Sequence, residues 1–245
     1  MTEMKYVLDS HTHTVASGHA YSTIHEMAKE ASEKGLELLG ITEHSMAMPG
    51  TCSDMYFTNF KVLPRELYGV QMMYGTELNI MDFDGTIDMS ERLLKRMDVV
   101  IASLHVPCIP FGSREQNTNA YLKVMENPYV DIIGHPDDDR YPVDYEALVQ
   151  AAAEHHILLE LNNSSMHPKA SRKGAAENDL ILLEQCKKYR VPVLLGSDAH
   201  TQEDVGNFTW LLPILEKAQF PEELIVNRSV QEYKKYTQRF KRGEE

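Results

Sequence analysis

Histidines and acidic residues recur in this chain at points where an apolar run of sequence ends. The first such point combines a carboxylate with two imidazoles, in Asp9-Ser10-His11-Thr12-His13. Imidazole nitrogens and carboxylate oxygens are donor atoms that zinc, iron and manganese bind in proteins. If these groups meet at one place, they form a site for more than one metal ion. The residues at the ends of the runs are His11, His13, His44, Glu77, His105, His135, Asp198 and His200.

The apolar runs before these residues have the length and content of β-strands. Val99-Val100-Ile101 is typical, because a parallel strand buried on both faces reads as continuous apolar sequence. Seven strands are predicted, with ends uncertain by a few residues. They span Tyr6–Asp9, Leu36–Thr42, Gln71–Glu77, Asp98–Leu104, Val130–Gly134, Ile157–Leu161 and Pro192–Gly196.

Helical patterns fill the gaps between the strands. From Ile24 to Ala31 the apolar residues recur at helical spacing, and Thr23 with Glu26 has the spacing of a capping box. Further helices are predicted at Tyr145–Glu154, Ala175–Tyr189 and Ser229–Phe240.

Strands that alternate with helices predict an α/β fold with a parallel sheet. In a barrel of this kind the strands end at one rim, and the loops that follow them carry the ligand-binding residues. A length of 245 residues is usual for one barrel domain. We therefore expect a single TIM-barrel-like domain over residues 1–245.

The spacing of the histidines favours chelation. His11 and His13 are two residues apart and project from the same face of a strand, as Asp198 and His200 do at the last strand. A single pair of this kind arises by chance, but so many imidazoles at one rim would be costly without partners. By itself His19, in a loop, reads as a surface histidine.

Composition excludes several classes of protein. The net charge of −13 disfavours binding to a polyphosphate backbone, so nucleic acid is an unlikely partner. Three cysteines without CxxC spacing fit reduced thiols and a cytoplasmic location. No stretch reads as a signal peptide or as a membrane span. The oligomeric state is left open, a homo-oligomer included.

These motifs together resemble those of the PHP (polymerase and histidinol phosphatase) superfamily, and most of all its small stand-alone bacterial phosphatases. The resemblance extends over nearly the whole chain. The segments that carry it are 9–13, 19–23, 42–44, 134–136, 160–165, 172–174 and 195–200.

The resemblance implies a distorted seven-stranded (βα) barrel with three divalent metal ions, most suited to zinc, with manganese or iron as alternatives. It also implies a division of the ligands, in which Glu77 bridges two ions. The sets are His11, His13, Glu77 and Asp198 for the first ion, Glu77, His105 and His135 for the second, and His19, His44 and His200 for the third. The chain departs from the family at Glu43, where the family often has Asp, and this residue is expected to orient ligands.

The reaction implied is hydrolysis of a small phosphomonoester by a metal-bound hydroxide at the trinuclear site. Glu77 and Asp198 are the predicted catalytic residues of the centre. The leaving group needs a proton, and Asp198 and His167 are the candidates to supply it.

Substrate binding is predicted for three polar residues in loops after strands. Asn162 and Arg172 follow the sixth strand, and Arg114 follows His105. An arginine offers a planar fork for a phosphate or a carboxylate, and each of these two arginines could instead form a surface ion pair. The acidic run 137–139 reads as a solvated turn rather than a fourth metal site.

Other functions share parts of this pattern. A metal-dependent amidohydrolase also begins with HxH and ends with an Asp, although that fold generally has eight strands. A PHP exonuclease or phosphodiesterase would use the same ligands. A non-catalytic metal-binding module would show missing ligands, and none is missing here.

Overall fold

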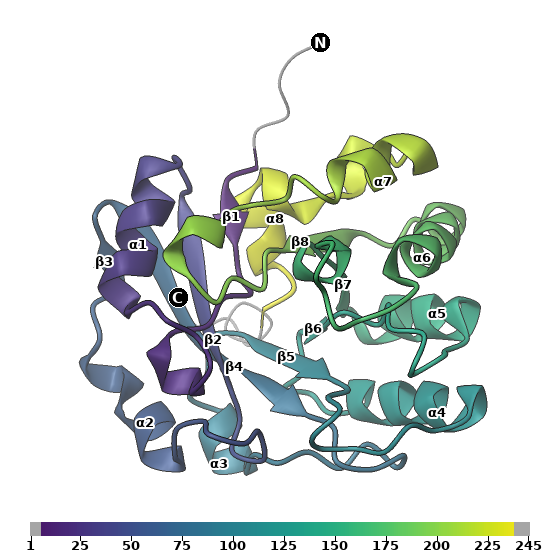
Figure 1. The fold of residues 1–245 in the computed structure, drawn as a ribbon, viewed down its shortest axis with the longest axis horizontal. Helices are drawn as coiled ribbons and strands as arrows, with labels where there is room; N and C mark the ends of the chain where they lie inside the picture. The colour runs from purple at the N-terminus through teal and green to yellow at the C-terminus, as the bar shows by residue number, and fades with distance from the viewer. Residues whose placement is uncertain (1–5, 238–245) are drawn as a thin grey trace.

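Seven parallel strands form the centre of the molecule (Figure 1). The computed structural model describes residues 6–237, so that Met1–Lys5 and the last eight residues lie outside the described part. Neighbours in the sheet follow chain order. The parallel strands are β1 (Leu8–Asp9), β2 (Leu38–His44), β4 (Val70–Asn79), β5 (Val100–Ser103), β6 (Ile132–Ile133), β7 (Leu158–Asn162) and β8 (Val193–Gly196).

Contacts between the first and last strands nearly close the sheet into a barrel. Just beyond β1 and β8, Thr12 and Ala199 form a parallel bridge, and the N–H of His13 donates to the carbonyl of Ala199 at 2.9 Å. Asp9 strengthens the closure, because its carboxylate accepts the Ser197 hydroxyl at 2.5 Å and the Gly206 N–H at 2.8 Å. The predicted seven-stranded α/β barrel is confirmed.

One strand was not predicted. The short β3 (Glu66–Leu67) pairs antiparallel with β4 at the start of that strand. It does not separate any two of the parallel strands, so the order around the barrel is unchanged.

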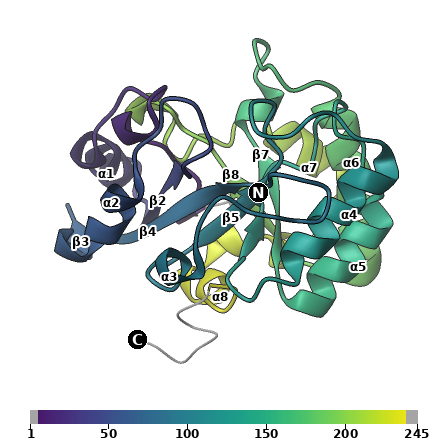
Figure 2. The ribbon, with the colours of Figure 1, turned by 90° about the horizontal axis from the view of Figure 1, so that it is seen from below.

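Helices cover the outside of the sheet. Figures 1 and 2 show α4, α5 and α6 side by side over one part of the barrel, with α1 and α2 on the other side. The α-helices are α1 (Ile24–Glu33), α2 (Asp54–Thr58), α3 (Glu91–Leu94), α4 (Arg114–Met125), α5 (Tyr145–His155), α6 (Ala175–Tyr189), α7 (Leu212–Ala218) and α8 (Val230–Lys234). Short 3₁₀ turns span Val15–Ser17, Asn59–Val62, Ser164–Met166, Gln202–Asp204, Glu222–Leu224 and Val226–Arg228.

Local sequence explains several helix ends. The predicted capping box begins α1, since Thr23 accepts from the N–H of Glu26 and Glu26 accepts from the N–H of Thr23. The helix predicted at Ser229–Phe240 is present as α8, but it ends at Lys234, so the prediction is too long over residues 235–237, and residues 238–240 lie outside the described part. Within residues 6–237 no helix is long and apolar enough to cross a membrane.

The strands contribute to two separate apolar clusters. One contains outward-facing residues such as Leu39 and Ile41, which pack against the helices. The other includes Leu8, Leu38 and the fully buried Tyr233 of α8. Inside the barrel, apolar packing thus ends part-way along the strands, and polar side chains occupy the carboxyl ends.

Candidate metal centre

All nine predicted metal ligands gather at the carboxyl ends of the strands. A cavity of about 290 Å³ opens there, and seven of the nine ligands line it. His11 and His13 are fully buried and do not line the cavity. The seven are His19, His44, Glu77, His105, His135, Asp198 and His200.

Glu77 lies between histidines from several strands. Its Oε1 is 3.1 Å from Nε2 of His105 and 2.8 Å from Nε2 of His135. Its Oε2 is 2.9 Å from Nδ1 of His44 and 3.4 Å from Nε2 of His13. Each oxygen therefore has its own group of imidazoles, which is the arrangement expected of a carboxylate that bridges two ions.

Asp198 occupies a similar place on the other side of the cluster. Its Oδ1 is 3.3 Å from Nε2 of His13, 3.7 Å from Nε2 of His11 and 3.6 Å from Nδ1 of His200. Asp198 and His200 follow the last strand, whereas His11 and His13 follow the first. The closure of the barrel brings these two pairs together.

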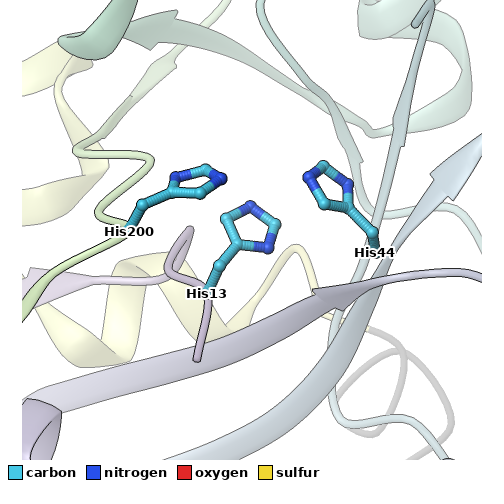
Figure 3. A group of neighbouring side chains, drawn as sticks. All are labelled: His13, His44 and His200. Atoms are coloured by element: carbon cyan, nitrogen blue, oxygen red, sulfur yellow. The ribbon is translucent and has the colours of Figure 1, made fainter. Parts of the chain in front are cut away.

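A third group consists of imidazoles alone. Figure 3 shows His13, His44 and His200 with their rings turned toward a common space. The ring of His13 lies 4.2 Å from that of His44 and 4.6 Å from that of His200, centre to centre. His19 joins them, at 5.0 Å from both His44 and His200.

The donor atoms form overlapping sets. In each of three sets the ligand atoms lie within 4.8 Å of one another, and these are His11 with His13 and Asp198, His13 with His44 and His200, and His44 with Glu77 and His105. The first set agrees with the division of ligands expected from the sequence. The other two sets differ from the division, because His13 lies with His44 and His200, and His44 lies with Glu77 and His105. The structure therefore supports one shared cluster more directly than it supports the division into three sets.

Several buried donor atoms of the cluster lack a hydrogen bond within the described chain. They are Nε2 of His11, Nε2 of His13, Nδ1 of His44 and Oε2 of Glu77. Such atoms are costly to bury without a partner. Because they face one another at coordinating separations and are nitrogen and oxygen donors, the residues present fit divalent metal ions.

The two carboxylates dominate the electrostatics of the cluster. Burial opposes protonation of His13, but the close carboxylates of Asp198 and Glu77 outweigh it and raise the pKa of His13 to about 9. Burial and the neighbouring His13 lower the pKa of His200 to about 4. Burial disfavours ionised Glu77, yet the surrounding histidines hold the pKa of Glu77 well below its usual value. The centre therefore attracts positive charge and keeps some imidazoles neutral for coordination.

Glu160 of β7 supports the cluster from the barrel interior. Its Oε1 is 2.6 Å from Nδ1 of His11, and its Oε2 accepts the backbone N–H of His135 at 2.9 Å. A Cβ at Gly196 would overlap Oε1 of Glu160. The glycine at that position thus leaves the space that the supporting carboxylate needs.

Two further polar groups orient histidines. Oδ1 of Asn79 lies 2.7 Å from Nδ1 of His105. Oε2 of Glu43 accepts the Ser17 hydroxyl at 2.6 Å, and that hydroxyl oxygen lies 3.2 Å from Nδ1 of His13. Such partners set the tautomer and the orientation of a ligating ring. Glu43 therefore acts on the ligand His13 through Ser17.

Two of the predicted ligands have left-handed backbone. The φ angle is 29° at His135 and 54° at Asp198. Residues with a side chain adopt this conformation at a cost of about 1–3 kcal/mol, and such residues cluster at functional sites. The surrounding hydrogen bonds maintain this strain, and both side chains are thereby directed to the cluster.

Of the residues predicted to bind substrate, Arg172 lines the cavity, whereas Asn162 is fully buried against Arg172 and Asp198 and does not line it. The Arg172 Nη2 donates to Oδ2 of Asp198 at 2.6 Å and to Oδ1 of Asn162 at 3.1 Å, and its Nε donates to the Ser165 hydroxyl at 2.6 Å. The guanidinium lines the cavity. It is thus a rigid cation beside the cluster.

Two other predicted residues, Arg114 and His167, lie away from the cavity and the cluster. Arg114 lies at the start of α4, where its Nη2 is 3.4 Å from Oδ2 of Asp144, and both side chains are largely exposed. His167 is also exposed, and its ring faces that of Trp210 with centres 6.1 Å apart. For Arg114 the structure shows the surface ion pair that the sequence left open.

The prediction of a solvated turn at residues 137–139 is wrong for two of its members. Asp137 and Asp138 are buried, and only Asp139 is exposed. Asp138 is covered because it forms an ion pair with Arg140, and Asp137 lies in the electrostatic field of Arg172 and His135. The ion pair compensates the burial of Asp138. For Asp137 burial outweighs the attraction to Arg172 and His135 and raises the pKa of the carboxyl. Sequence spacing reveals neither environment.

Sequence reasoning did not assign supporting roles to Glu160 or Asn79. Glu160 alternates with the apolar Leu159 and Leu161 inside a buried strand, and that isolated charge is a signal that could have revealed it. Asn79 closes β4 two residues after Glu77, on the same face of the strand.

Comparison with known proteins places this arrangement in a family. The model of the PHP domain matches residues 9–164. The chain belongs to the PHP family. A PHP assignment was predicted from the ligand motifs, and it is confirmed.

Curated relatives of this PHP protein cover almost its whole length. A probable phosphatase of Clostridium novyi is 52% identical over 224 residues, which are 91% of each chain. A probable phosphatase of a Thermoanaerobacter species is 47% identical over 246 residues, covering 99% of this chain and 100% of the relative.

Solved structures share the fold at low identity. The histidinol phosphate phosphatase of Lactococcus lactis, complexed with zinc, L-histidinol and phosphate, has a TM-score of 0.57 at 18% identity and covers 88% of this chain and 95% of its own. A chain of an archaeal ribonuclease P complex with mature tRNA also has a TM-score of 0.57 at 18% identity, with coverage of 94% and 91%. These two likenesses show the fold of the PHP family.

Proposed function

We propose that the protein is a metal-dependent phosphatase that hydrolyses a small phosphomonoester at a centre of three divalent ions. The observation that carries the proposal is the convergence of nine imidazole and carboxylate side chains, seven of which line one small cavity and several of which have unpartnered buried donor atoms. The names of the curated relatives, probable phosphatases over nearly the full chain, support the type of reaction.

The predicted ligands would hold the ions, with Glu77 shared between two of them. A donor set rich in imidazole suits zinc, with manganese or iron as alternatives. When bound, the ions would supply an activated water as nucleophile and positive charge to stabilise the transition state.

Arg172 would orient the phosphate. Its guanidinium is held by Asp198, Asn162 and Ser165 and lines the cavity next to the cluster, so it needs little rearrangement to meet a phosphate oxygen. A fixed cation is more effective than a mobile one because its orientation is set before the substrate binds.

Asp198 is the better placed of the two candidates for proton transfer. Burial disfavours its charge, but His11, His13 and Arg172 hold the pKa of Asp198 well below its usual value. As an ionised carboxylate it would accept a proton from water and pass it to the leaving oxygen. His167 lies outside the cavity lining, and the geometry gives it no such contact.

The experiment that tests the proposal combines metal analysis with a panel of substrates. Protein purified without chelator is expected to contain close to three divalent ions per chain and to release phosphate from phosphomonoesters. A phosphodiester, single-stranded DNA and a cyclic amide form the rest of the panel. One ion or fewer per chain, or turnover of the amide alone, would contradict the proposal.

A further inference from the structure

A second arginine, Arg140, lines the same cavity as the metal centre. It follows β6 in a loop that also contributes Asp138 to the lining. Its side chain is 25% exposed. Nothing in the proposed hydrolysis of the phosphate itself requires this residue, since Arg172 is the arginine that contacts Asp198.

Asp138 holds the Arg140 guanidinium by one edge. Nε lies 3.0 Å and 2.9 Å from the two carboxylate oxygens, and Nη2 lies 2.6 Å from Oδ2. A guanidinium has five N–H donors in a planar fork, so this contact engages the side edge and leaves the end edge, formed by Nη1 and Nη2. Between residues 6 and 237 no other hydrogen bond of the Arg140 side chain is found.

An aromatic ring restrains the same group. Cζ of Arg140 lies 5.8 Å from the centre of the Phe111 ring, a distance at which a cation and a ring attract. Phe111 in turn contacts Tyr141 edge to face, with ring centres 5.2 Å apart. The plane of the guanidinium is therefore fixed by a carboxylate and a ring before any ligand arrives.

The other residues that line the cavity indicate the chemistry of the substrate beyond its phosphate group. Met48, Leu104, Val106 and Pro107 add apolar groups to the lining of the cavity. A volume of about 290 Å³ accommodates a phosphate and a small organic group. A leaving group of a few carbons would contact these side chains, and any anion on it would need a cation other than Arg172.

We propose that the substrate carries a second anionic group, a carboxylate or a phosphate, on its leaving group, and that the end edge of Arg140 binds it. This inference rests on the proposed phosphatase function and narrows its substrate class. Because Asp138 offsets the charge of Arg140, recognition depends on charge-assisted hydrogen bonds with fixed geometry more than on net charge.

A matched series of three-carbon substrates tests the proposal on metal-loaded protein. The series comprises propyl phosphate, 3-phosphooxypropanoate and propane-1,3-diyl bisphosphate. The rate of phosphate release is measured for each substrate. The wild type is expected to prefer one or both anionic members in kcat/KM, and the preferred member tells carboxylate from phosphate. In Arg140→Gln the ratio of anionic to neutral substrate should fall by about 10-fold or more, mainly through KM. Arg190→Gln, at an exposed ion pair with Glu223, is the matched control.

The outcomes separate this inference from the function on which it rests. A wild type that hydrolyses all three substrates equally overturns the second-anion subsite and leaves the phosphatase standing, and this result needs no variant. An equal loss on all three substrates in Arg140→Gln also overturns it. Should that variant fail to fold, Arg140→Lys, which keeps the charge but not the fork, must show the same fall in the ratio. Failure to hydrolyse any of the three refutes the phosphatase function.

Discussion

Oε1 of Glu160 lies 2.6 Å from Nδ1 of His11, and both side chains are fully buried. The other oxygen of Glu160 accepts the N–H of His135, so one carboxylate supports two predicted ligands from different strands. A glutamine would direct an NH₂ group toward one of these donors and remove the charge. We expect Glu160→Gln to weaken metal binding by about 10- to 100-fold.

Titration of chelator-treated protein with zinc against a competing indicator measures this effect. Glu154→Gln, the same substitution at an exposed position of α5, is the control and should bind as the wild type does. Wild-type affinity in Glu160→Gln would show that the contact does not set the position of His11.

Glu77→Ala should abolish turnover and remove more than one equivalent of metal. The reason is that the two oxygens of Glu77 contact separate groups of histidines, including His44 and His135. Elemental analysis after gel filtration measures the loss, with the exposed Glu184→Ala of α6 as control. Retained activity would rule out the bridging role.

Glu43→Asp should bind metal less tightly, by about 3- to 10-fold, although it restores the residue that the family often has. Removing one methylene withdraws the carboxylate from the Ser17 hydroxyl, which lies beside His13. Zinc titration of Glu43→Asp and Glu43→Gln compares the effect of length with that of charge. If Glu43→Asp binds zinc as tightly as the wild type, the link through Ser17 has no influence on the ligand.

Asp179 of α6 should make stability depend on pH. Its side chain is fully buried with no hydrogen-bond partner in residues 6–237. Burial, reinforced by the charges of Asp137 and Glu160, raises the pKa of Asp179 well above its usual value. The folded protein keeps the proton at a pH where the unfolded chain releases it. Stability is therefore highest below the unfolded pKa and falls as the pH rises toward the folded pKa.

Asp179→Asn removes this dependence, so the gain in stability should grow from pH 5 to pH 8. At pH 8 the variant should be more stable than the wild type, because the folded wild type must hold a proton that the unfolded chain releases or bury a charge, and asparagine does neither. Thermal unfolding of the two proteins across this range measures the gain. The exposed Glu184→Gln on the same helix should show none. A gain that stays constant with pH would contradict the raised pKa.

The fold could be predicted closely because each parallel strand is a local signal. The run expected at Gln71–Glu77 is β4, Val70–Asn79, and the run expected at Leu36–Thr42 is β2, Leu38–His44. The two-residue β3 was missed because it has too few residues for a periodic pattern.

Most of the cluster could also be predicted, since donor residues at strand ends converge in any parallel barrel. His19 lies in a loop and reads alone as a surface histidine, so only the resemblance to the family included it. The contacts that support these residues could not be predicted from the sequence. Glu160 meets His11 across 149 positions of sequence, and the fork of Arg140 depends on how Asp138 and Phe111 lie in three dimensions. Arg114 and Arg172 look alike as loop arginines, and the fold alone separates the surface pair from the cavity residue.

Closure of the barrel between β1 and β8 has a consequence for biosynthesis. His11 and His13 leave the ribosome early, but Asp198 and His200 follow only after almost two hundred further residues have been made. A nascent chain therefore displays isolated pairs of imidazoles, which capture cations weakly. Full occupancy of the proposed metal centre would have to wait until translation is nearly finished, so a chain cut short before position 198 would lack two of the predicted ligands.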